Sequence, residues 1–125
     1  MDRKILFIAL AGTVGTLARY WLSGAVYKVF GADLPWGTWA VNILGCFLFG
    51  LVWVLAEERY LISGEARVVI LVGFMGAFTT FSTYIFESSQ LVFDAQWARL
   101  AANLAGQNIV GFAGLALGMT LGRVL

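Results

Sequence analysis

The sequence predicts an all-α membrane protein with four transmembrane helices. Of its 125 residues, 61% are hydrophobic and only 12% are charged, which is about half the charged share of a typical soluble domain. Short polar segments divide the chain into four apolar stretches of about 19 to 25 residues, each long enough to cross a bilayer as a helix. The expected spans of this single domain (1–125) are residues 5–29, 34–56, 68–86 and 100–122.

The first two spans each carry a polar side chain that apolar helices seldom contain. Arg19 in the first span costs about 2.5 to 3.5 kcal/mol on insertion scales if it faces lipid. It either extends toward the nearby interface or draws anions into a vestibule. Asn42 in the second span offers two amide N–H donors. It either joins helices, the ordinary role of such a residue, or donates to an anion that has lost its water.

The third span places glycines and hydroxyls at the middle of an apolar stretch. Residues 73–84 read GFMGAFTTFSTY and surround Ala77, the midpoint of the span. Such a patch at mid-depth can free backbone carbonyls, which then need protein, a bound ion or a water-lined cavity as partners. An ion pathway is therefore the first hypothesis.

Aromatic and acidic side chains follow this segment. Phe81 and Tyr84 are three residues apart and share a helix face, and the positive edge of an aromatic ring can meet an anion. Ordinary aromatic packing explains the same spacing. Glu87 continues this face and either lines a vestibule or ends the span as an interfacial charge. In an anion path its carboxylate needs a proton or a hydrogen-bond donor.

The fourth span combines a glycine stripe with amides. Gly114, Gly118 and Gly122 recur at intervals of four, a spacing that lets helices approach closely in lipid, although glycine is also common in spans generally. The amides are Asn103, Gln107 and Asn108, of which Asn108 lies nearest to mid-depth. Some of them are expected only to join helices. Because four helices cannot easily hide these groups from lipid, and because the glycine face suits close helix contact, we expect a second copy.

Positive charge specifies the orientation only weakly. With four spans both termini share a side, which then carries five basic residues: Arg3, Lys4, Arg59, Arg67 and Arg123. The other side carries Lys28 and Arg99, with Arg19 in the half-span nearest to it. This small bias sets no strong preference, so it permits insertion in both orientations.

Catalysis is not expected. The chain contains no histidine, only one cysteine, Cys46, and no cluster of carboxylates. It therefore lacks the residues for a transition-metal centre or a Ser–His nucleophile.

These motifs resemble the Fluc (CrcB-type) fluoride channels over nearly the whole chain. The resemblance rests on four short spans, Gly-Thr-x-x-Val-Asn at residues 37–42, Gly-x-x-Gly-x-x-Thr-Thr-Phe-Ser-Thr at residues 73–83, and Arg19. It implies a fluoride-selective channel that passively exports fluoride that entered the cytoplasm as hydrofluoric acid. It also implies an antiparallel, dual-topology homodimer in the plasma (inner) membrane, with a broken third helix, two fluoride pathways and a structural sodium ion (Na+) at its centre.

The resemblance also implies roles for individual residues of this sequence. Backbone carbonyls of Gly76 and Thr79 from both chains hold the sodium ion. The implied fluoride pathway comprises Asn42, Phe81, Ser82, Thr83, Tyr84 and Asn108, with Arg19 and Glu87 in the vestibule. Tyr84 departs from the family pattern, which has a second phenylalanine there, and its hydroxyl adds a donor and an acceptor beside the ring. Asn108 stands where members often carry a serine.

Two other classes of protein remain as alternatives. A small proton-coupled multidrug exporter also has four spans, but it needs a membrane-embedded carboxylate. The first two spans contain none, and only Glu87 is available. A non-transporting assembly subunit needs neither a break at residues 76–79 nor Asn42. Fluoride efflux from proteoliposomes separates the three classes.

Overall fold

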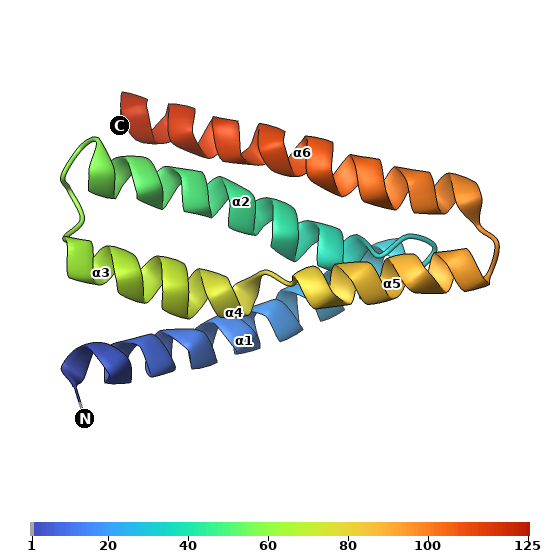
Figure 1. Cartoon of the computed structure of the whole chain (residues 1–125), viewed down its shortest axis with the longest axis horizontal. Helices are drawn as coiled ribbons and strands as arrows, with labels where there is room; N and C mark the ends of the chain where they lie inside the picture. Colours follow the sequence, from blue (N-terminus) through green and yellow to red (C-terminus); the bar gives the residue numbers. More distant parts are fainter. Residues whose placement is uncertain (1) are drawn as a thin grey trace.

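Four long helical segments run side by side along the longest axis of the molecule (Figure 1). The computed structural model describes residues 2–125. The segments are α1 (Arg3–Phe30), α2 (Trp36–Glu57), the third segment (Gly64–Phe93) and α6 (Trp97–Val124). Each is long and apolar enough to cross a membrane, and each overlaps one of the predicted spans. Both chain ends lie at the same end of the bundle (Figure 1).

The first connection shows how the sequence ends one helix and begins the next. The Asp2 side chain caps the start of α1 by accepting a hydrogen bond from the Lys4 amide at 3.2 Å. The helix ends at Gly31, whose φ of 77° lies in the region that favours glycine. Pro35 directly precedes α2, where its missing N–H costs no helical hydrogen bond.

The third segment consists of several short elements. In chain order they are α3 (Gly64–Val68), the π-helical turn η1 (Val69–Met75), α4 (Gly76–Phe78) and α5 (Phe81–Phe93). Thr79 and Thr80, between α4 and α5, have extended backbone. Thr80 caps α5, because its side-chain oxygen accepts a hydrogen bond from the Thr83 amide at 3.2 Å.

Glycines allow α2 and α6 to approach backbone to backbone. A Cβ atom added at Gly118 of α6 would lie 1.9 Å from the Phe47 carbonyl oxygen, and one at Gly50 of α2 would lie 2.4 Å from the Leu115 carbonyl oxygen. The glycine stripe of α6 therefore packs against α2 of the same chain. The expectation that this face favours a second copy is not supported, because its partner is already present.

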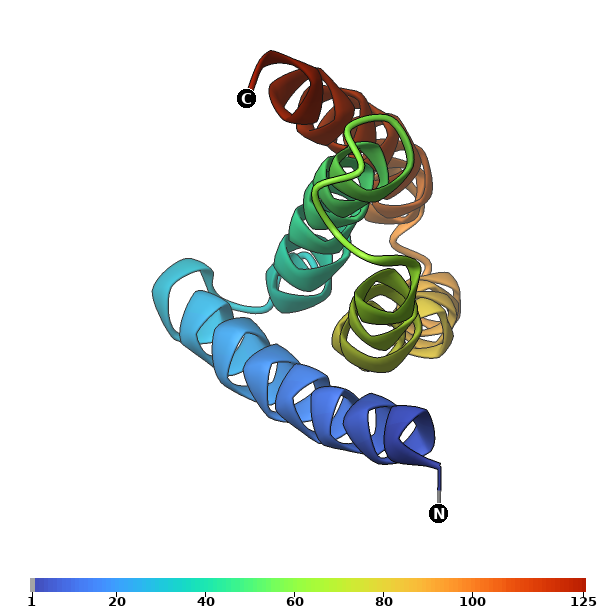
Figure 2. The ribbon, with the colours of Figure 1, turned by 90° about the vertical axis from the view of Figure 1, so that its left-hand side faces the viewer.

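The buried core lies between α2 and the first half of the third segment. Val41, Met75 and Phe78 form it, and partly buried apolar residues surround them: Ala18, Leu22, Leu48, Leu71 and Phe74. Figure 2, viewed along the bundle, shows α2 between α1 and α6. Large apolar side chains such as Trp21, Phe86 and Phe112 are exposed, as expected for surfaces that meet lipid or another chain.

Candidate ion pathway

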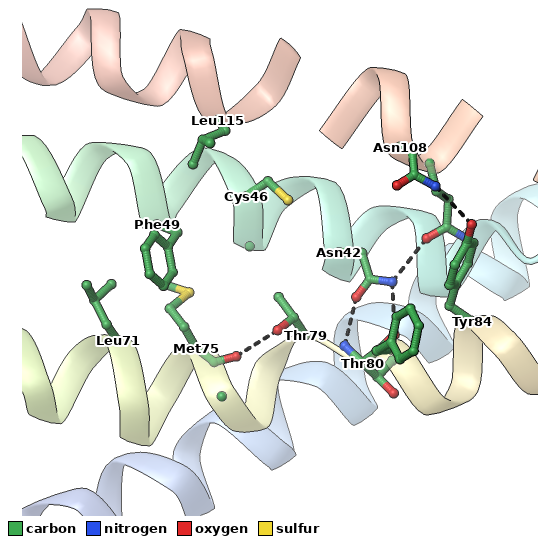
Figure 3. Close-up of a pocket in the computed structure, with 14 residues that line it drawn as sticks. Asn42, Cys46, Phe49, Leu71, Met75, Thr79, Thr80, Tyr84, Asn108 and Leu115 are labelled. Atoms are coloured by element: carbon green, nitrogen blue, oxygen red, sulfur yellow. Dashed lines mark hydrogen bonds between the residues drawn. The ribbon is translucent and has the colours of Figure 1, made fainter. Parts of the chain in front are cut away.

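A cavity of about 420 Å³ lies beside the extended residues of the third segment (Figure 3). It is bounded by α2, α6 and both parts of the third segment. Its lining residues are Asn42, Gly45, Cys46, Phe49, Leu71, Met75, Gly76, Thr79, Thr80, Phe81, Tyr84, Gln107, Asn108 and Leu115. The fold thus brings together the predicted site residues Asn42, Gly76, Thr79, Phe81, Tyr84 and Asn108.

Asn42 is bonded to the backbone of Thr80 at two points. Its Oδ1 accepts a hydrogen bond from the Thr80 amide at 2.7 Å, and its Nδ2 donates to the Thr80 carbonyl at 3.1 Å. Nδ2 also donates to Gln107 Oε1 at 3.0 Å. Asn42 therefore stabilises the extended backbone between α4 and α5 by replacing helical partners with its own amide (Figure 3).

The same contacts change the hydrogen bonding of two backbone carbonyls. In a continuous helix, the Thr80 and Thr83 amides would donate to the Gly76 and Thr79 carbonyls. Here the Thr80 amide donates to Asn42 Oδ1 and the Thr83 amide to Thr80 Oγ1. Side-chain acceptors thus take the helical donors of Gly76 and Thr79. The Thr79 hydroxyl also donates to the Met75 carbonyl at 2.9 Å, so its one proton is already used within the chain.

Phe81 and Tyr84 form a tilted aromatic pair in the cavity wall. Their ring centroids are 5.9 Å apart and their planes meet at 46°. Phe81 is 74% exposed, whereas Tyr84 is buried. The Tyr84 hydroxyl donates to the Leu104 carbonyl at 3.3 Å and accepts a hydrogen bond from Asn108 Nδ2 at 3.0 Å. The one hydroxyl proton of Tyr84 is therefore directed to α6.

Ser82 and Thr83 are not among the residues that line the cavity. Ser82 is exposed. Thr83 is half-buried, and its hydroxyl accepts a hydrogen bond from Thr80 Oγ1 at 2.9 Å. Thr83 therefore contacts the cap of α5, one layer behind the cavity wall.

Arg19 lies at the interruption of the third segment, outside the lining of this cavity. Its Nε donates to the Ala77 carbonyl at 2.9 Å. The side chain thus contributes a positive charge beside α4 and satisfies one of the backbone oxygens that precede the extended residues. This contact favours an inward role over extension to the interface.

Glu87 lies in a second cavity of about 410 Å³, near the connections that follow α1 and α5. Its Oε1 accepts hydrogen bonds from the Tyr27 hydroxyl at 3.1 Å and the Thr38 hydroxyl at 3.0 Å. Its Oε2 is buried and has no hydrogen-bond partner among the described residues. The carboxyl thus has the donor partners that the sequence analysis required, on one of its two oxygens.

Asn103 and Gln107 enter the site although the sequence analysis assigned them no specific position. Gln107 lines the cavity and contacts Asn42, and Asn103, which is fully buried, accepts hydrogen bonds from Gln107 and from the Trp39 indole. The available signal was their spacing of four, which places both on one face of α6. The sequence singles out Asn108 because it lies nearest to mid-depth. The depth of a residue does not show which face of α6 points into the bundle.

The fold and this cavity define a small polytopic membrane protein whose third segment is opened by a side-chain amide beside an aromatic pair. A family model described as CrcB-like protein, Camphor Resistance (CrcB), matches residues 6–119. The chain belongs to this family and is a multi-pass membrane protein.

Full-length relatives support the same assignment. The chain is 63% identical over 125 residues to the fluoride-specific ion channel FluC of Solidesulfovibrio magneticus and 56% identical over 125 residues to that of Nitrosococcus oceani, with 100% of both chains covered in each comparison. It is 38% identical over 122 residues to FluC of Magnetococcus marinus, covering 98% of this chain and 99% of the relative. These relatives are named as ion channels and not as enzymes, which is consistent with the expectation that the chain is not an enzyme.

Proposed function

We propose that this protein is a fluoride-selective channel that passively exports cytoplasmic fluoride across the plasma (inner) membrane. The observation that carries the proposal is the cavity at the interruption of the third segment. There the Asn42 amide meets an exposed aromatic ring, Phe81, with no carboxylate in the lining. Amide donors and ring edges suit an anion. Full-length relatives named fluoride-specific ion channels specify which anion.

The proposed path follows the polar side of the third segment. Asn42 and the pair Phe81 and Tyr84 contact the ion in the cavity, and Asn108 supports the Tyr84 hydroxyl. Ser82 and Thr83 continue the path along the outer side of α5. Arg19 and Glu87 form the vestibules, where the Arg19 charge attracts anions and the hydroxyls on Glu87 offset its charge.

The functional unit that we propose is an antiparallel dual-topology homodimer with a third helix broken inside the bilayer. Phe81 and Asn108 line the cavity and are exposed in a single chain. In a lone chain the Asn108 amide would face hydrocarbon, which polar groups avoid. A second copy in the opposite orientation covers these residues, and the weak charge bias permits that orientation.

A structural sodium ion at the dimer centre fits the backbone at the interruption. Sodium prefers oxygen ligands, and the Gly76 and Thr79 carbonyls have lost their helical donors to Asn42 and Thr80. Two carbonyls from each of two chains give an all-oxygen set, the type of site found where helices are broken in membrane proteins. The ion would fix the two interruptions relative to each other. Side chains of this protein, and not the sodium ion, would orient hydrogen-bond donors toward the anion.

Fluoride efflux from proteoliposomes tests the function. Purified protein is reconstituted with internal fluoride or chloride, and efflux is started by an electrical shunt without a proton gradient. We expect rapid fluoride efflux with little chloride efflux. Efflux that requires a proton gradient would point instead to the proton-coupled exporter, and no efflux of either anion would overturn the channel assignment.

The proposed sodium site is tested with a variant that displaces Thr79. A Cβ atom added at Gly45 would lie 2.1 Å from the Thr79 Cγ2, so Gly45→Ala forces Thr79 to shift. We expect Gly45→Ala to raise the sodium concentration needed for fluoride flux about fivefold or more, since loss of a ligand of this kind costs about 1 kcal/mol or more. Thr79→Ser removes the clashing methyl group, and the double variant should recover. Wild-type flux that persists after sodium is replaced by N-methyl-D-glucamine would contradict the site.

A further inference from the structure

A line of hydrogen bonds, one buried and two partly buried, connects α2 to α6 beside the cavity. Trp39 Nε1 donates to Asn103 Oδ1 at 2.8 Å, and Gln107 Nε2 donates to the same oxygen at 2.8 Å. Asn42 Nδ2 then donates to Gln107 Oε1 at 3.0 Å. Asn103 is 0% and Gln107 7% exposed, whereas Trp39 and Asn42 are half-buried. We call these four residues the amide relay.

The two ends of the amide relay fix the direction of every amide in it. The Trp39 indole N–H can only donate, so an oxygen of Asn103 must face it. At the other end the Thr80 backbone N–H can only donate, so an oxygen of Asn42 must face it. These constraints agree only if Gln107 turns its nitrogen to Asn103 and its oxygen to Asn42. Reversal of the amides would place two donors against each other at Trp39 and at Thr80.

Both N–H groups of Asn42 are therefore occupied. One donates to the Thr80 carbonyl and the other to Gln107 Oε1. The contact with Thr80 is reinforced by the return bond from the Thr80 amide, whereas the contact with Gln107 is a single bond between two side chains. An anion that takes an N–H of Asn42 thus displaces the Gln107 oxygen more readily than the Thr80 carbonyl.

We propose that Gln107 Oε1 is the resident acceptor on Asn42 and that a permeating anion must displace it, which makes Gln107 a determinant of anion selectivity. The inference rests on the proposed function. An N–H that loses its acceptor without gaining another carries a penalty that grows with its burial. A small anion that accepts hydrogen bonds strongly, such as fluoride, compensates for the lost amide oxygen. A larger and weaker acceptor, such as chloride, does not, so the exchange rejects it.

Trp39 and Asn103 act through Gln107 and are positioning residues. Asn103 holds the Gln107 nitrogen, and Trp39 holds Asn103 in the direction that this bond requires. Gly106 makes the arrangement possible, because a Cβ atom there would lie 2.2 Å from the Trp39 ring. The indole can lie against α6 only over a glycine at this position.

Removal of the resident acceptor is the first test. Gln107→Leu and Gln107→Met leave Asn42 with a free N–H, and we expect the ratio of fluoride to chloride flux in proteoliposomes to fall about tenfold, the effect of one hydrogen bond. Fluoride should also half-saturate the current at a lower concentration. Both variants must elute as the wild-type assembly. A wild-type flux ratio in both would overturn the inference, whereas absence of fluoride flux in the wild type would instead overturn the proposed function.

The positioning residues are tested by coupling. Trp39→Phe and Gly106→Ala should each lower the flux ratio a few-fold, in the same direction as Gln107→Leu but less. Neither should lower it further in a Gln107→Leu background, since residues that act through a shared partner are not additive. Trp97→Phe is the matched control, because Trp97, the first residue of α6, is exposed. Equal, additive losses from all tryptophan variants would show general packing effects and overturn the positioning role.

A spectroscopic titration detects the displacement of Gln107 from Asn42 without a measurement of flux. In lipid-reconstituted protein with labelled side-chain amides, sodium fluoride should shift the Asn42 and Gln107 amide resonances together, and sodium chloride at the same concentration should shift neither. A fluoride-dependent shift of Asn42 with an unmoved Gln107 signal would show that Gln107 is not displaced. That result would overturn the inference even in a conducting channel.

Discussion

The two halves of α6 contact α2 by opposite means. In the C-terminal half the contact is made by backbone, because Gly114, Gly118 and Gly122 remove the side chains that would separate the helices. In the N-terminal half the contact is made by buried amides, through Asn103 and Gln107. Dispersion contacts hold the C-terminal half of α6 against α2, and directional hydrogen bonds hold the N-terminal half.

This difference suggests that one half of α6 supports folding and assembly and the other half supports anion selectivity. Close packing over a glycine fixes the distance between two helices but has no polarity. An amide has a donor end and an acceptor end that must each find a partner. The glycine half should therefore respond to added volume with loss of folding. The amide half should respond to changed polarity with loss of anion flux while the protein still assembles.

The largest effect is expected at the closest point of the glycine half. In Gly118→Ala the new Cβ would lie 1.9 Å from the Phe47 carbonyl oxygen, an atom of the backbone that cannot rotate away. Overpacking of this kind costs about 1 to 3 kcal/mol or more, and we expect loss of the monodisperse peak in size-exclusion chromatography. Gly111→Ala is the matched control, since its Cβ would lie 3.5 Å from Cys46 Sγ, an ordinary contact. Equal behaviour of the two variants would contradict the backbone contact.

The second effect reverses the polarity of the amide half. Asn42→Asp keeps an oxygen for the Thr80 amide but places the other against Gln107 Oε1 and the Thr80 carbonyl. Two donors become acceptors, and an ionised carboxylate also repels anions. We expect fluoride flux to fall at least about 100-fold, because two hydrogen bonds of about 1 kcal/mol each are lost and repulsion is added. The variant should elute like the wild type, and wild-type flux would return Asn42 to a purely structural role.

The sequence predicted the helices better than the partners of the polar residues. Hydropathy alone indicated four long apolar helices, because burial in lipid demands a continuous apolar run. The rotation of each helix about its axis is set by packing, and hydropathy does not report it. The depth of the amides in the span therefore drew attention to Asn108. The face of α6 that contacts Asn42 carries Gln107. The glycine stripe was read as a surface for another chain for the same reason, although its partner is α2.

The sequence left two alternatives for Tyr84, the ring edge or the hydroxyl as the group that meets an anion. The hydroxyl donates to the Leu104 carbonyl at 3.3 Å, which favours the ring edge. We expect Tyr84→Phe to change selective fluoride flux by less than about threefold, since a single long hydrogen bond is lost. Tyr84→Ile removes the quadrupole and should lower flux up to about tenfold. The two variants are compared in one flux assay, and a damaging Tyr84→Phe would assign the hydroxyl as the ligand.

The smallest effect is expected where the glycine half of α6 ends. Arg123 donates to both oxygens of Glu58, Nε to Oε2 at 2.9 Å and NH2 to Oε1 at 2.8 Å. These hydrogen bonds and the charge of Arg123 hold the pKa of Glu58 below its usual value. A carboxyl whose pKa is lowered by folding stabilises the protein above its unfolded pKa, and the contribution disappears as the pH falls through the folded value. Because exposed ion pairs contribute little, Glu58→Gln should lower the thermal midpoint in detergent only slightly at about pH 7. The difference from wild type should vanish as the pH is lowered through the folded pKa of Glu58, and a difference that grew on acidification would show that the Glu58 carboxylate is not stabilised by Arg123.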